Sequence, residues 1–254
     1  MKRYLFILAL VTLVLASCSK VERNEKKYVE AMRSDDYQAA SQAFDEYCNW
    51  MVSDKATMTH DFKLMREKMG LTIAASKDGR LRCYSLPTSA GKDVKVYANI
   101  VQWMVDGHFV GFTGPVDKLL AGRSGNIKKR GTMAHLIDTI YQIDNTEPTV
   151  YIIEQSYTNV DGKNRAYVSA ACIDGLVLRL LPFFFDGIEI AGNYEFNPGG
   201  KISTSDLFKW DEQTGRFYAY QTDDNYNVIP GRYTVYQLDK DRFKRLPDNP
   251  DNQN

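Results

Sequence analysis

Five Asp-Gly dipeptides occur in the chain after residue 70, and each lies between runs of apolar, β-branched and aromatic residues. Asp-Gly readily adopts the positive φ angles that tight hairpin turns require. Recurrence of this signal between strand-like runs predicts an antiparallel meander over residues 71–246, curled as a sandwich or partial barrel. The dipeptides are Asp78-Gly79, Asp106-Gly107, Asp161-Gly162, Asp174-Gly175 and Asp186-Gly187.

The segment before the meander has helical periodicity. Apolar residues recur at spacings of three and four from Tyr28 to Met51, with Ser34 as the expected N-cap of the main helix. A second helix is expected from about Thr57 to Met69, ended by Gly70. The two predict a helical hairpin over residues 28–70, so the expected fold class is α+β.

The expected strands follow from runs of alternating residues. Residues 114–132 interrupt them as a loop rich in Gly, Lys and Arg, and residues 247–254 form a polar tail. The runs cover residues 71–76, 81–86, 94–105, 108–112, 149–157, 165–173, 176–184, 188–196, 207–210, 216–222, 232–238 and 242–246.

The first seventeen residues have the organisation of a signal peptide. Lys2 and Arg3 are followed by an apolar run from Leu5 to Leu15, which is too short for a membrane span. The chain is therefore expected to be exported.

The end of this run, Leu15-Ala16-Ser17-Cys18, resembles the lipobox of bacterial lipoproteins. The resemblance implies cleavage before Cys18, a diacylglyceryl thioether on its sulfur and acylation of the new amino terminus, for example with palmitate. Residues 18–27 would then be a lipidated polar tether in the cell envelope, at the periplasmic or surface face of the outer membrane. The alternative is an ordinary secretory peptide with a chance cysteine.

Two further motifs resemble uncharacterised exported lipoproteins of Bacteroidota-type bacteria. The first runs from Ser76 through Asp78-Gly79 to Ser85, and the second is Asn99-Ile100-Val101-Gln102. Leu86-Pro87 stands where relatives have Trp-Asp. The resemblance implies location and fold, and it assigns no chemistry.

Composition narrows the class of partner. Lys and Arg total 32, as do Asp and Glu, so the formal net charge is zero. The chain therefore lacks the excess of basic residues that is typical of proteins that bind nucleic acid. Besides Cys18 the chain has Cys48, Cys83 and Cys172, which are expected to be buried thiols, with one disulfide as the alternative.

No local motif indicates catalysis. His60, His108 and His135 are isolated in sequence, and the chain contains neither His-Glu-x-x-His nor Cys-x-x-Cys, so no metal or cofactor is expected. Cys83 or Cys172 paired with a distant histidine is an open alternative, although both lie in apolar runs typical of core thiols.

Two groups of residues are candidate binding surfaces. The basic loop has Arg123, Lys128, Lys129 and Arg130, and the C-terminal strands are rich in aromatic residues, among them Trp210, Tyr218, Tyr220 and Tyr226. Exposed rings can stack on sugars or on a partner's apolar surface. The alternatives are a solvated loop and rings that fill a sheet interface.

These observations predict a lipid-anchored, non-catalytic envelope module that binds a glycan, a peptide or a neighbouring protein. The alternative is a glycan-directed envelope hydrolase whose carboxylates come from separate strands. A third possibility is an inhibitor or chaperone of an exported enzyme.

Overall fold

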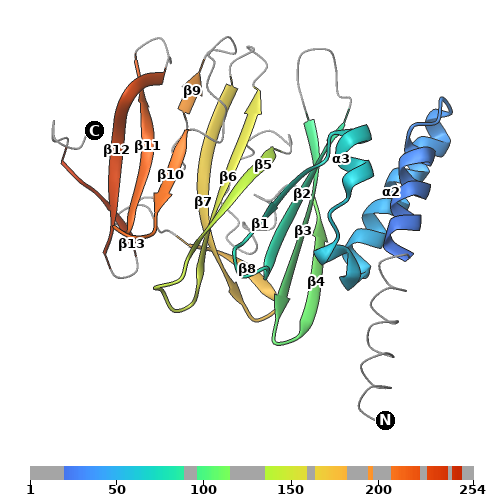
Figure 1. Cartoon of the computed structure of the whole chain (residues 1–254), viewed down its shortest axis with the longest axis horizontal. Coiled ribbons are helices and arrows are strands. Elements are labelled where there is room, and N and C mark those ends of the chain that lie inside the picture. The colour runs from blue at the N-terminus through green and yellow to red at the C-terminus, as the bar shows by residue number, and fades with distance from the viewer. Residues whose placement is uncertain are drawn as a thin grey trace, which may run out of the picture.

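The computed structural model describes residues 20–88, 96–114, 135–158, 164–181, 194–196, 207–223, 228–239 and 242–247. These residues form helices at the N-terminal side and three antiparallel sheets (Figure 1). The α+β class is therefore confirmed, although the single large sheet expected from the sequence is divided into three. Within the described residues, no helix has the length and apolarity needed to cross a membrane.

The N-terminal helix, residues 20–32, replaces most of the polar tether expected at residues 18–27. Val21 is 2% exposed and Val29 is also buried, because one side of this helix packs into the protein. The sequence prediction failed here because the charged residues dominate the segment and its few apolar residues give a weak signal. The described chain is thus held against the body from Lys20 onward.

Helix α2 (Tyr37–Ser53) begins at Asp36 and not at the predicted Ser34. The Asp36 carboxylate accepts hydrogen bonds from the backbone N–H groups of Gln38 and Ala39, while Ser34 Oγ accepts from the N–H of Asp36. The cap lies two residues later because Asp36 supplies the stronger acceptor.

The second predicted helix is broken into the 3₁₀ helix η1 (Lys55–Thr59) and helix α3 (Lys63–Met69). Phe62 between them is fully buried in a left-handed conformation with φ 50°. Arg82 donates hydrogen bonds to the carbonyls of Met58 and His60, which occupies acceptors that a continuous helix would use.

The strands form three four-stranded meanders, and the second has one extra strand. The predicted turns at Asp78-Gly79, Asp106-Gly107 and Asp174-Gly175 are confirmed, each with a positive φ at its glycine, while the other two dipeptides lie outside the described residues.

Sheet A comprises β1 (Thr72–Ala75), β2 (Leu81–Thr88), β3 (Val96–Val105) and β4 (His108–Thr113). Sheet B comprises β5 (Leu136–Ile143), β6 (Val150–Thr158), β7 (Asn164–Asp174) and β8 (Val177–Leu181), with β9 (Tyr194–Phe196) also paired to β7. Sheet C comprises β10 (Phe208–Asp211), β11 (Arg216–Thr222), β12 (Val228–Asp239) and β13 (Arg242–Arg245).

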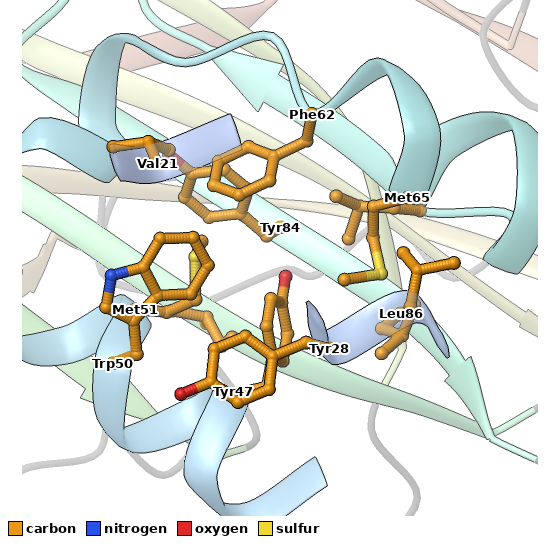
Figure 2. Close-up of a cluster of buried hydrophobic side chains, with 12 residues drawn as sticks. Val21, Tyr28, Tyr47, Trp50, Met51, Phe62, Met65, Tyr84 and Leu86 are labelled. Carbon is orange, nitrogen blue, oxygen red and sulfur yellow. The ribbon is translucent and has the colours of Figure 1, made fainter. Parts of the chain in front are cut away.

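Three hydrophobic clusters join these elements in the order helices, sheet A, sheet B and sheet C. Figure 2 shows the first cluster, in which helical residues such as Tyr47 and Met51 cover Tyr84 and Leu86 of sheet A. The second joins sheets A and B, and the third joins the other face of sheet B to sheet C. Sheets A and B are therefore covered on both faces.

Polar side chains fix the helices on sheet A. Gln102 Nε2 donates to the Met51 carbonyl and to Thr57 Oγ1, at 2.7 Å from the latter, and Gln102 Oε1 accepts from Tyr84 OH at 2.9 Å. Gln102, Thr57 and Tyr84 are fully buried, so the loss of any one leaves unsatisfied polar atoms in the interface.

Helix α2 approaches β4 so closely that only glycine fits at position 111. A Cβ there would lie 2.5 Å from Val52 Cα and 2.7 Å from the Val52 carbonyl oxygen, both backbone atoms. The contact sets the distance between the helix and the sheet.

We expect Gly111→Ala to lower the free energy of unfolding by about 3 kcal/mol, because the added methyl group must push α2 away from sheet A. Urea unfolding followed by circular dichroism measures this. Thr113→Ala, an exposed position on the same strand, is the control and should change stability by less than about 0.5 kcal/mol. Equal stability of the two variants would contradict the close approach.

Candidate binding face

The outer face of sheet C is the surface that the strand register turns away from sheet B. Phe217 and Ala219 of β11 face sheet B, so Tyr218 and Tyr220 lie on the opposite face. In Figure 1 this sheet forms the end of the molecule farthest from the helices. The register thus defines a face of sheet C that points away from sheet B.

Three tyrosines cluster on this face. Tyr233 of β12 lies opposite Tyr220, with ring centroids 4.2 Å apart, and donates a hydrogen bond from its hydroxyl to the Tyr220 hydroxyl at 2.7 Å. Tyr218 meets the Tyr233 ring edge to face at 5.9 Å. Burial, and then the hydrogen bond and charge of Tyr220, raise the pKa of Tyr233 to about 12. The half-buried rings therefore form one ordered platform.

Polar and basic side chains lie beside the platform. Lys209 pairs across the strands with Tyr218, and its ammonium lies 5.9 Å from the centre of that ring. The next row across the sheet contains Asp211, Arg216, Gln237 and Lys244, where Arg216 Nε donates to Gln237 Oε1 and Lys244 pairs with Asp239. The face thus combines flat aromatic surface with a charged, hydrogen-bonding row.

Trp210 does not belong to this face, which corrects the sequence prediction. It packs against Phe243 with ring centroids 5.7 Å apart, at the hydrophobic cluster between sheets B and C. Alternation along β10 directs Phe208 and Trp210 inward and Lys209 outward. The remaining predicted site residues, Arg123, Lys128, Lys129, Arg130, Tyr226 and Cys18, lie outside the described residues.

The sequence prediction missed Lys209, Arg216 and Lys244, because their place on the aromatic face depends on strand register. Tyr218 and Tyr220 were found because a spacing of two places them on one face of any strand. The same rule predicts that Tyr233 and Tyr236 point to opposite faces, and Tyr236 indeed packs against the core.

A second polar group lies where sheets A and B meet, at Asn99 of β3. The backbone carbonyl of Asn99 accepts a hydrogen bond from the Gly114 N–H, and the Asn99 side-chain Nδ2 donates to the backbone carbonyl of His135 at 2.7 Å. His135 Nδ1 is hydrogen-bonded to Tyr167 OH, which donates to Gln155 Oε1 at 3.0 Å. Asn99 therefore ties together the two described residues that flank positions 115–134.

The Ser76 motif has an architectural role. Asp78 accepts hydrogen bonds from Ser76 Oγ and from Tyr151 OH of sheet B, at 2.6 and 2.8 Å. Lys77 forms ion pairs with Asp144, in the turn after β5, and with Glu212, in the turn after β10. One hairpin turn of sheet A thus contacts both other sheets.

The remaining reactive side chains are dispersed. Cys48, Cys83 and Cys172 are free thiols, and burial raises the pKa of Cys48 to about 11 and that of Cys83 further. Among the described residues the buried carboxylates are Glu25 and Glu154, which lie in different layers. Glu25 pairs with His60 at 2.9 Å, and Tyr141 OH lies 3.0 Å from Glu154 Oε2. The described residues contain no group of three His, Cys, Asp or Glu that could hold a metal ion.

Comparison of the chain with protein-family models, with curated proteins and with solved structures gave no match.

We expect the free energy of unfolding to fall as pH rises from about 10 to about 12, because folded Tyr233 keeps a proton that the unfolded chain loses near its ordinary pKa. Tyr233→Phe removes this contribution, so its stability should fall less over the same interval than that of the unchanged protein. Urea unfolding at a series of alkaline pH values measures both slopes. Tyr37→Phe, at an exposed position outside the cluster, should keep the original slope; identical slopes for all three proteins would contradict the raised pKa.

Proposed function

We propose that this protein is a lipid-anchored, non-catalytic module of the bacterial cell envelope, exported by residues 1–17 and attached through Cys18. The lipobox resemblance and the likeness to exported lipoproteins of Bacteroidota-type bacteria support this location. The helices and sheets would stack as a layered sandwich, with the helical segment as a cap at one end. Such a stack would present the outer face of sheet C as a rigid surface.

The face of sheet C supports an acidic oligosaccharide as the partner. Tyr218, Tyr220 and Tyr233 offer ring surface on which the apolar face of a sugar can stack. Lys209 lies beside Tyr218 and Arg216 lies in the adjacent row, where they can attract a carboxylate or sulfate group of the same ligand. The single observation that supports this function is the ordered tyrosine platform beside Lys209 and Arg216.

We expect the full-length chain in detergent to bind an acidic oligosaccharide more tightly than a neutral one of equal length, in isothermal titration calorimetry. Tyr218→Ala should weaken binding by at least about tenfold, because it removes ring surface at the centre of the face. Tyr37→Ala, at an exposed tyrosine of α2, is the matched control and should leave affinity unchanged. Equal loss in both variants, or binding of peptides and proteins alone, would contradict a glycan site on sheet C.

The anchor is tested separately. We expect cells that express the chain to incorporate labelled palmitate into it and to retain it in the membrane fraction. Cys18→Ala should abolish the label and release the protein, because the sulfur is the attachment atom. Unchanged labelling and fractionation of the variant would contradict the anchor.

A further inference from the structure

The N-terminal helix allows almost no slack between the proposed anchor and the folded body. Lys20 already belongs to this helix, and Val21, Tyr28 and Val29 of the same helix are buried in the cluster beneath it. Cys18 precedes Lys20 by two residues, a reach of about 7 Å even when fully extended. A lipidated Cys18 would therefore hold the Lys20 end of the body directly at the bilayer surface.

Figure 1 shows which other parts of the protein lie at that end. The N-terminal helix begins at the lower end of the helical layer in this view, and the β3–β4 and β7–β8 turns project below it. The turn is tight, because Asp174 pairs across it with Val177 and Gly175 has a φ of 56°. Both structures would face the membrane together.

The β7–β8 turn has an unusual surface for a tight turn, where polar residues are the rule. Leu176 is 62% exposed and Val177 is 55% exposed. Among the described residues only Tyr37 is another strongly exposed large hydrophobic side chain, and it starts α2 at the opposite end of the N-terminal helix. The two exposed aliphatic side chains are thus adjacent and lie at the anchored end.

The base of the turn fixes the direction in which this apolar tip projects. Leu178 is 1% exposed and packs between sheets A and B, while Arg179 forms an ion pair with Asp174 at 3.0 Å. A charged pair behind an apolar tip suits the boundary between headgroups and acyl chains, since the tip can enter the apolar layer while the charges stay hydrated.

We propose that Leu176 and Val177 insert into the lipid bilayer as a second contact beside the lipidated Cys18. This contact rests on the proposed anchor and goes beyond it, because it defines the orientation of the body. The strands then stand on the membrane, and the outer face of sheet C points sideways along its surface. A glycan partner would be met beside the protein and not above it.

The test uses the full-length lipidated protein in vesicles of phosphatidylethanolamine and phosphatidylglycerol that contain a doxyl-labelled lipid. A bimane probe is placed at Leu176→Cys or, as the matched control, at Tyr37→Cys, each combined with Cys48→Ser. Cys83 and Cys172 are buried, so they do not compete for the probe. Both probe positions are exposed, so unchanged unfolding midpoints are expected for the labelled proteins.

We expect the doxyl lipid to quench the probe at position 176 at least about twofold and the probe at position 37 by less than about a tenth, since only the former enters the apolar layer. Quenching at position 37, or at neither position, in protein that has incorporated palmitate overturns the inserted tip but leaves the anchor standing. Absence of palmitate from the protein would overturn both the proposed anchor and the inserted tip. Removing the lipid through Cys18→Ala should abolish the quenching at position 176.

Discussion

Burial of β6 on both faces is the constraint on which the rest of the structure depends. All residues from Val150 to Ser156 are buried, so the strand has no face for solvent. Tyr151 and Ile153 belong to the cluster with sheet A, and Val150 and Ile152 to the cluster with sheet C. The strand can be stable only when another layer covers each of its faces, and sheets A and C supply that cover here.

The polar residues within the interfaces give these layers their relative positions. Apolar contact alone tolerates small shifts between sheets, whereas a buried hydrogen bond is lost when its partners slide apart. Gln102 holds the helices on sheet A, Asp78 holds sheet A on Tyr151, and Tyr141 OH lies 3.0 Å from the Phe208 carbonyl of sheet C. Each interface thus has at least one such bond.

This arrangement separates two ends of the protein with different surfaces. The helices bring Lys20, and with it the proposed anchor, to one side of the stack, while sheet C terminates the other side with its tyrosine platform. Between these ends, sheets A and B are covered on both faces by hydrophobic clusters. Both the proposed ligand face and the proposed membrane contact therefore have defined directions.

The sequence by itself determined the local features of this protein. Asp-Gly turns, the amphipathic α2 and the shared face of Tyr218 and Tyr220 follow from backbone conformation and from periods of 3.6 and 2. The division into three sheets, the packing of residues 20–27 on the body, the inward position of Trp210 and the charged row beside the tyrosines were decided only by tertiary structure. Strand alternation shows which residues share a face, but whether that face is buried depends on the layer that packs against it, and such contacts join residues far apart in the chain.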